Sequence, residues 1–519
     1  MTPAEKLAGA LEELHHLQEK GRIAIYTNDI KSRQIRERLV KNGFLKEVTK
    51  GWYIATDPQE KAGDSTSWYV SFWEFCARYL EHKFGMEYCL SPEQSLQLHT
   101  GNRNVPPQLI VRSPKANNSM TPFPFNTSMF NYRKDLPERE LLVNDRGLWL
   151  YSLPAAMIYC TAAYYRENPI ESRAGLGMIK EASVLLTILL KNGNTTLAGR
   201  LAGAFRNIGK DQIADQIIET MRAAEYDVRE DDPFQGKIPF EFKREFSPFV
   251  IRIKLMWQEM REKVIQAFPD APGLPEDPVA FMKKLDEGYV IDAYHSLSIE
   301  RYKVSPELIE WVRSGKWIKN LNDHNGHRDA MAARGYYLSF QEVKISIQKI
   351  LEGANPGNVS AQDHSKWYRS LFEPSVSAGL LKPSDLAGYR NQQVYPGGSK
   401  HVPLSIEAMR DVMPVLFELL LEEPEASVRA VLGHFIFVFI HPYSDGNGRM
   451  GRFLMNSMLA SGGYPWTVVP VGRRHEYRNA LESASVHLDI GPFARLIADL
   501  VRKSLIGKPE ANLDHVRHE

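Results

Sequence analysis

The sequence has 519 residues, of which 43% are hydrophobic and 24% charged, as in ordinary folded proteins. At roughly 150 residues per domain, this length predicts three or four domains. Its 64 basic and 63 acidic side chains exclude a globally basic nucleic-acid coat and a highly charged disordered chain. The three cysteines have neither metal nor disulfide spacing, and the N-terminus does not resemble a signal peptide. The apolar run at 435–440 is too short to span a bilayer. These features predict a cytoplasmic protein with no membrane partner.

The first 58 residues predict a winged helix-turn-helix. The expected elements are a helix over 4–19, a short helix over Arg22–Tyr26, a cap at 27–29, a basic helix over Lys31–Asn42, and a hairpin over 44–54. Residues 20–54 contain nine basic and three acidic side chains, so their net charge is +6 in a chain of net charge +1. Such a concentration is typical of a surface that binds duplex DNA, although a protein-docking domain or a solvated helix face is the alternative. The predicted DNA-binding residues are Arg33, Gln34, Arg36, Arg38, Lys41 and Lys50.

A mixed α/β region is predicted over 59–240. Its expected strands lie at 109–111 and 148–151, and its expected helices at 154–165, 175–190 and 212–223. Prolines at 269, 272, 275 and 278 predict an extended spacer rather than a packed element, so 241–278 is interpreted as a helical connector and proline-rich linker. The last domain is placed at 279–505, with a tail at 506–519. Within it, Ser339 predicts the N-cap of a helix over 340–352.

The candidate catalytic residues lie in one run between two apolar helical stretches, His441-Pro-Tyr-Ser-Asp-Gly-Asn-Gly-Arg-Met-Gly-Arg452. Glycines at the start of a helix let the backbone approach an anion, and the free N–H groups there favour phosphate. Arg449 and Arg452 lie three residues apart and share one helix face. Asp445 is suited to Mg²⁺, and His441 to accepting a proton from a hydroxyl. Together these groups favour attack on a phosphate over a plain glycine loop with a buried histidine.

This run resembles the signature of the Fic family, His-Pro-Phe/Tyr-x-Asp/Glu-Gly-Asn-Gly-Arg-x-x-Arg, at every defined position. The resemblance covers about 285–500. It implies an all-α core with a β-hairpin flap, and transfer of AMP from ATP to a Ser, Thr or Tyr hydroxyl of a target protein. It also implies a role for each residue: His441 as general base, Asp445 as Mg²⁺ ligand, Gly446, Asn447, Gly448 and Arg449 on the α- and β-phosphates, and Arg452 on the γ-phosphate. Gly448 differs from the lysine of the related Doc kinases, which favours nucleotidyl transfer.

Three further segments resemble parts of this family. Residues 388–403 read as two short strands around a Pro-Gly-Gly turn, like the family's flap, with an ordinary surface hairpin as the alternative. Tyr477 resembles the aromatic residue near the adenine, with a core tyrosine as the alternative. Ser296 and Glu300 match an inhibitory Ser/Thr-x-x-x-Glu-Gly/Asn helix, except that Arg301 replaces the Gly/Asn. In that case Glu300 would pair with Arg452; otherwise these residues form an ordinary helix face.

Residues 1–240 resemble AbiE-type antitoxins, which are transcriptional regulators. The sequence thus predicts a mainly α, multidomain fold with an N-terminal winged helix, a mixed α/β middle and an all-α Fic core. The predicted function is an autoinhibited adenylyltransferase fused to a DNA-binding module, with ATP as substrate and Mg²⁺ as cofactor. The alternative is an antitoxin-like DNA-binding regulator whose Fic domain senses nucleotide or removes AMP. A homo-oligomer is left open.

Overall fold

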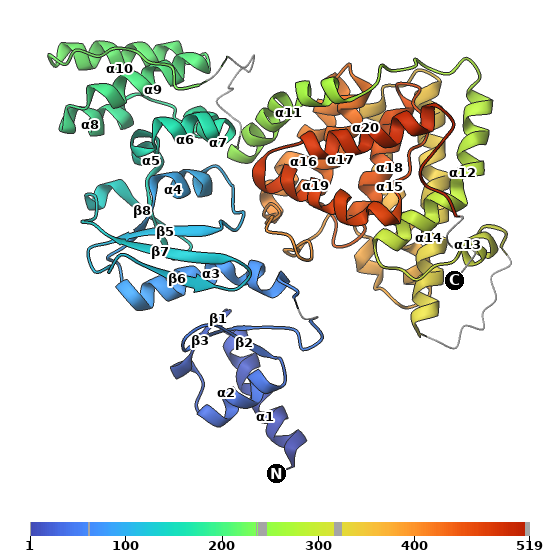
Figure 1. The fold of residues 1–519 in the computed structure, drawn as a ribbon, viewed down its shortest axis with the longest axis horizontal. Coiled ribbons are helices and arrows are strands. Elements are labelled where there is room, and N and C mark those ends of the chain that lie inside the picture. The colour runs from blue at the N-terminus through green and yellow to red at the C-terminus, as the bar shows by residue number, and fades with distance from the viewer. Residues whose placement is uncertain (1, 61–62, 235, 237–246, 316–323, 514–519) are drawn as a thin grey trace. The chain divides into compact units, whose positions relative to one another are not determined.

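The computed structural model describes residues 2–60, 63–234, 236, 247–315 and 324–513 (Figure 1). It divides into unit 1, Met1–Arg252 with Tyr395–Val402, and unit 2, Ile253–Val394 with Pro403–Glu519. The fold is mainly α, as predicted, with three small sheets in the described part of the chain. Of the predicted connector and tail, 241–246 and 514–519 lie outside the described residues, and the predicted domain boundaries stay predictions.

Unit 1 begins with a small helical and sheet module. Its elements are α1 (Pro3–Glu19), β1 (Ala24–Tyr26), a 3₁₀ turn (Thr27–Asp29), α2 (Arg33–Lys41), β2 (Leu45–Thr49) and β3 (Trp52–Ala55). The strands form an antiparallel sheet of order β1-β3-β2. Leu14, Leu39 and Tyr53 bury apolar surface between the helices and this sheet. The predicted first helix, basic helix and hairpin are therefore confirmed.

The short helix predicted at Arg22–Tyr26 is wrong, because most of that segment is strand β1. Ala24 and Ile25 are fully buried and pair with Ile54 and Tyr53 of β3. The cap predicted at 27–29 is a 3₁₀ turn, and the side chain that caps α2 is Ser32, which accepts from the Ile35 N–H at 3.3 Å. Pairing with a distant strand overrode the local helical pattern.

The rest of unit 1 holds a four-stranded sheet and a group of short helices. The sheet has the order β4-β5-β7-β6, with β5 and β7 parallel, and β8 pairs with β9 separately. The strands are β4 (Cys89–Leu90), β5 (Gln108–Ser113), β6 (Ser119–Phe123), β7 (Thr127–Arg133), β8 (Leu142–Asp145) and β9 (Leu148–Tyr151). The helices are α3 (Thr66–Phe84), α4 (Pro92–His99), α5 (Leu153–Tyr159), α6 (Ala162–Glu167), α7 (Pro169–Met178), α8 (Ser183–Asn192), α9 (Thr195–Asn207) and α10 (Asp211–Ala223).

Both predicted strands of this region and its last predicted helix are confirmed as β5, β9 and α10. The helix predicted over 154–165 is instead two helices, α5 and α6. They part at Cys160-Thr161, where the Thr161 hydroxyl accepts from the Tyr164 N–H at 3.1 Å and starts the second helix. The helix predicted over 175–190 is likewise divided between α7 and α8.

The regular elements of unit 2 are helical throughout its described residues. They are α11 (Pro248–Ala267, which begins in unit 1), α12 (Pro278–Ile299), α13 (Pro306–Arg313), α14 (His324–Leu351), α15 (Pro356–Ser377), α16 (Ile406–Glu422), α17 (Ala426–Ile440), α18 (Asn447–Ala460), α19 (Arg474–His487) and α20 (Gly491–Leu505). Helices α17 and α18 are buried along nearly their whole length and form the centre of the unit. No helix in the described ranges is both long and apolar enough to cross a bilayer.

One predicted helix start in unit 2 is wrong. Ser339 is not an N-cap, because it lies buried inside α14, which runs unbroken from His324. The backbones of α14 and α15 approach closely at Gly335, where a Cβ would overlap the Leu371 carbonyl, so packing rather than a capping residue decides where this helix runs. The proline-rich segment is irregular and mostly exposed, and one backbone bond ties it down, from Gly273 N–H to the Gly462 carbonyl at 3.0 Å.

The predicted hairpin over 388–403 differs from the structure, where this segment contains no strand. Its turn is present, with Gly398 at a φ of 75°. The backbone groups bond elsewhere: Gly398 N–H donates to Thr66 Oγ1 at 3.1 Å, and the Lys400 carbonyl accepts from Val105 N–H at 3.1 Å. Two prolines in the segment also lack the N–H that a ladder needs, so its two arms do not pair.

Candidate active site

The central loop of unit 2 connects α17 to α18 and reverses the chain at two left-handed residues. His441 (φ 56°) ends α17, with its N–H donating to the Phe437 carbonyl at 3.0 Å. Gly446 (φ 79°) precedes α18, and a Cβ there would lie 2.8 Å from the Phe372 ring. Only glycine avoids both the unfavourable φ and this clash, which explains why the loop needs it.

Asn447 shapes the loop from inside. It is 2% exposed, its Oδ1 accepts from the Tyr443 N–H at 2.9 Å, and its Nδ2 donates to the Tyr443 carbonyl at 2.7 Å. The Tyr443 ring stacks on Tyr368 with centroids 3.8 Å apart. The side chain of Asn447 therefore binds within the loop. The group of this residue that could make the predicted phosphate contact is its backbone N–H.

The imidazole of His441 is prepared to accept a proton. Its Nδ1 lies 3.2 Å from the Val438 carbonyl, which can only accept, so Nδ1 carries the hydrogen and Nε2 has the free lone pair. Burial lowers the pKa of His441 to about 4, while the bond to Val438 opposes this shift. The ring is therefore neutral at physiological pH, the state that a general base needs.

Arg449 and Arg452 are both buried at the start of α18, with 1% and 4% of their surface exposed. Arg449 Nη2 lies 3.4 Å from Asp445 Oδ2, and Arg452 Nε donates to Ser296 Oγ at 2.8 Å. Within the described residues, Arg449 Nε and Arg452 Nη1 have no hydrogen-bond partner. Buried cationic donors without acceptors fit a site that takes an anionic ligand.

Glu300, the C-cap of α12, reaches into this site. Its Oε1 accepts from Arg452 Nη2 at 2.8 Å, and the Ser296 carbonyl accepts from the same nitrogen at 3.0 Å. Burial acts to raise the pKa of Glu300, but the charge and hydrogen bond of Arg452 outweigh it, so this pKa is lowered. A Cβ at Gly448 would overlap Glu300 Oε1. The carboxylate thus lies against the first turn of α18, where a phosphate oxygen is predicted to bind.

The chain leaves α12 through a turn that brings a second side chain to the site. Arg301 N–H donates to the Ser298 carbonyl and Tyr302 N–H to the Leu297 carbonyl, which is the Schellman pattern. Arg301 occupies the left-handed position of that turn at a φ of 69°, where glycine or asparagine is favoured. The Tyr302 ring then lies 5.1 Å from the guanidinium carbon of Arg449. One turn therefore contacts both arginines.

Asp445 and Tyr477 lie in contrasting surroundings. The Asp445 side chain is 67% exposed, and its Oδ1 accepts from Gly446 N–H at 2.6 Å. A solvent-exposed carboxylate next to buried groups that are predicted to bind phosphate fits the role of a Mg²⁺ ligand. Tyr477 is 3% exposed, and its hydroxyl lies 2.9 Å from His434 Nε2. The structure therefore holds Tyr477 within the core.

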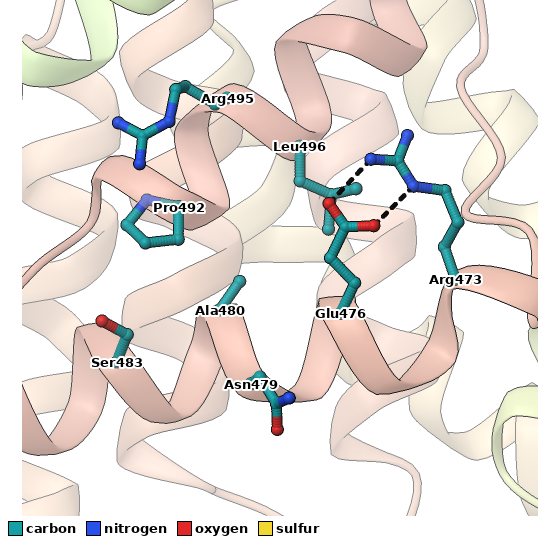
Figure 2. A pocket seen from close by; sticks show the side chains of 8 residues that line it. All are labelled: Arg473, Glu476, Asn479, Ala480, Ser483, Pro492, Arg495 and Leu496. Atoms are coloured by element: carbon teal, nitrogen blue, oxygen red, sulfur yellow. Dashed lines mark hydrogen bonds and ion pairs between the residues drawn. The ribbon is translucent and has the colours of Figure 1, made fainter.

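A separate cavity of about 680 Å³ lies between α19 and α20 (Figure 2). Arg473 forms a two-bond ion pair with Glu476 at its rim, at 2.7 Å for each bond. None of the predicted site residues is among the described residues that line it, which are Arg473, Glu476, Asn479, Ala480, Ser483, Pro492, Arg495 and Leu496.

The predicted DNA-binding residues lie on α2 and at the tip of the β2–β3 hairpin, as expected. Arg33, Gln34, Lys41 and Lys50 are exposed, and Arg36 and Arg38 are partly buried. Some of these charges are engaged: Arg33 Nε lies 2.6 Å from Glu37, and Arg38 Nη1 donates to the Lys6 carbonyl at 3.2 Å.

The sequence did not point to two residues that contact the predicted site. Arg390 is 1% exposed and donates from Nε to the His441 carbonyl at 2.8 Å. Tyr302 contacts Arg449, as described above. No spacing in the sequence marks either residue, because each meets a partner more than 50 positions away.

Comparison with known proteins gives the same family as the sequence motif. Residues 358–459 match the model of the Fic/DOC family. The chain is 26% identical to protein adenylyltransferase Fic of Nematostella vectensis over 264 residues, which is 49% of this chain and 56% of the relative. It is 30% identical to the same-named protein of Drosophila virilis over 233 residues, or 44% of each chain. The chain thus spans about half the length of the curated relatives it matches.

Solved structures with similarity to the chain include a fragment of Fic-1 from C. elegans, at 18% identity and a TM-score of 0.38 over 67% of this chain and 97% of that one. A Fic domain containing signaling protein from Bacteroides thetaiotaomicron has 17% identity and a TM-score of 0.35, over 49% of this chain and 97% of that one.

Proposed function

We propose that this chain, which contains a Fic domain, is a protein adenylyltransferase that moves AMP from ATP to a Ser, Thr or Tyr hydroxyl of a target protein. One observation carries the proposal. A neutral imidazole with a free Nε2 ends α17. Two buried arginines lie eight and eleven residues further on, near the start of α18, and each has a nitrogen without a partner among the described residues. A base beside an anion site is what attack on a phosphate needs.

The chemistry follows from these positions. His441 Nε2 takes the proton of the target hydroxyl, the hydroxyl oxygen bonds to the α-phosphorus, and the bond to the β-phosphate breaks to release pyrophosphate. The first turn of α18, with Gly446, Gly448 and Arg449, would hold the α- and β-phosphates, and Arg452 the γ-phosphate. Asp445 would hold Mg²⁺, which neutralises charge on the phosphate oxygens when it is bound.

The proposal includes autoinhibition. Supporting it, the Glu300 carboxylate already pairs with Arg452 and lies where a Cβ at Gly448 would be. An anion held there competes with the γ-phosphate for the same guanidinium. ATP would then bind without the terminal contact that orients it for transfer.

The test is label transfer from α-labelled ATP, with the full chain as its own acceptor and with host extract as a source of targets. We expect weak labelling by the unaltered chain, strong labelling by Glu300→Gly, and none when His441→Ala is added. Nucleotide binding without label transfer in all three would contradict the proposal. It would favour the alternative of a nucleotide sensor or an enzyme that removes AMP.

A second function, duplex-DNA binding by residues 1–58, is favoured by the net charge of +6 over 20–54. Exposed Arg33, Gln34 and Lys41 on α2 could reach phosphates or base edges, and exposed Lys50 at the hairpin tip offers a further cation. Fluorescence anisotropy of the full chain on the DNA upstream of its own gene tests this role. Absence of binding at low salt would assign the basic face to protein docking or to solvation. A cytoplasmic location completes the proposal.

A further inference from the structure

Arg390 is a buried cation that donates hydrogen bonds to backbone carbonyls of the loop between α17 and α18 and of residues 392–404, and to the Gln393 side chain. Its own N–H donates to the Pro442 carbonyl at 2.9 Å, and its Nε donates to the His441 carbonyl at 2.8 Å. Two successive carbonyls of the loop are therefore held by one residue. The His441 carbonyl lies at the C-terminal end of α17, where carbonyls lack intrahelical partners, and the Pro442 carbonyl follows it.

The other end of the guanidinium binds a different part of unit 2. Arg390 Nη1 donates to the Gln392 carbonyl at 3.1 Å, and Nη2 donates to the Leu404 carbonyl. Gln393 Nε2 also donates to the Pro403 carbonyl at 2.9 Å, which joins the two ends of the 392–404 segment. The fork of Arg390 thus links the loop to both ends of that segment, and a lysine could not make these bonds together.

His441 needs such support. It is a residue other than glycine in the left-handed region, a conformation that persists only where surrounding contacts enforce it. Its imidazole direction depends on this backbone, because the Nδ1 bond to Val438 and the carbonyl bond to Arg390 hold the same residue from two sides.

We propose that Arg390 is a positioning residue for proton transfer, since it fixes the backbone of His441 and thereby the place of Nε2. This inference rests on the proposed adenylyltransferase function. The bonds of Arg390 described above go to the His441 and Pro442 carbonyls and to the 392–404 segment, so we expect its replacement to affect the chemical step more than ATP binding.

The experiment compares Arg390→Lys and Arg390→Gln with a matched control, Arg429→Lys, all in the Glu300→Gly chain. Arg429 is another buried arginine of unit 2 that donates to backbone carbonyls, those of Glu423 and Pro424, away from the loop. We expect the Arg390 variants to lower the self-labelling rate at saturating ATP about 10²-fold, as for a base displaced by about 1 Å. Their ATP dissociation constant should stay within about twofold, and the control should change neither quantity.

A second measurement keeps this inference separate from the proposed function. The ring resonances of His441, assigned by comparison with His441→Ala, should shift in both Arg390 variants and not in Arg429→Lys. If Glu300→Gly transfers no label but these resonances shift, the proposed function fails, and what stands is only that Arg390 fixes the backbone and the ring of His441. Unchanged resonances, or labelling within about twofold, would overturn the positioning role, and the two Arg390 substitutions guard against one of them failing to fold.

Discussion

Arginines at the start of α18 and Arg33 on α2 have the same chemistry in contrasting surroundings, while Arg36 and Arg38 of α2 are partly buried. Arg449 and Arg452 are 1% and 4% exposed, and each keeps a buried nitrogen without a partner in the described structure. The Arg33 side chain is 80% exposed and already paired with Glu37. Buried donors favour an anion bound directly at their position, because a buried donor without a partner raises the free energy of the folded state. Exposed charges act through a field that water and salt weaken.

The largest effect expected is on the buried group. His441→Ala should lower AMP transfer in the Glu300→Gly chain by about 10²–10⁴-fold, since it removes the general base. ATP affinity should be unchanged, because the arginines and the α18 N-terminus remain. Label transfer and calorimetric ATP binding are the measurements, with the exposed His475→Ala as control. Near-normal transfer by His441→Ala would show that His441 is not the general base.

The difference in burial between the two groups of arginines predicts that salt weakens DNA binding more than ATP binding. If the N-terminal module makes about four phosphate contacts, raising salt from about 50 to 200 mM should weaken DNA binding roughly a hundredfold. ATP binding should fall much less, because its cradle is buried. Anisotropy for DNA and calorimetry for ATP, on the same full-length chain, measure both. Equal salt dependence would mean that the two arginine groups do not differ as their burial indicates.

The third prediction concerns the anion that already occupies the buried group. Glu300→Gly should raise the rate of AMP transfer by about 10–100-fold, the equivalent of one charge-assisted hydrogen bond of about 1.5–3 kcal/mol released from Arg452. Glu300→Gln keeps the shape and loses the charge, so it separates electrostatics from packing. If neither variant changes the transfer rate, the ion pair between Glu300 and Arg452 is only structural.

The smallest effect expected comes from the turn after α12. Arg301 holds a left-handed conformation that costs roughly 1 kcal/mol for a residue other than glycine. Arg301→Gly should relieve this, hold Glu300 more firmly, and lower transfer about fivefold. In the Glu300→Gly chain the same change should have no effect. An equal decrease in both backgrounds would show that Arg301 acts on the fold and not through Glu300.

Much of the site could be predicted because its members are close in sequence. The segment from His441 to Arg452 is a continuous run, and its glycines, carboxylate and arginines have roles that depend on local helix geometry. The Ser296–Glu300 spacing likewise places both side chains on one face of α12, and the structure brings both to Arg452. Local spacing determines such pairs before any tertiary contact forms.

Only the tertiary structure decided the remaining features. The segment at Arg22–Tyr26 became a strand through pairing with β3, and 388–403 bonded to other residues instead of to itself. Arg390 and Tyr302 reached the loop from positions far away in the chain. The sequence alone determined the chemical groups and their order within the loop, since these depend on neighbouring residues. Strand pairing, buried clamps and burial-shifted pKa values depend on which distant surfaces meet, and no local pattern encodes that.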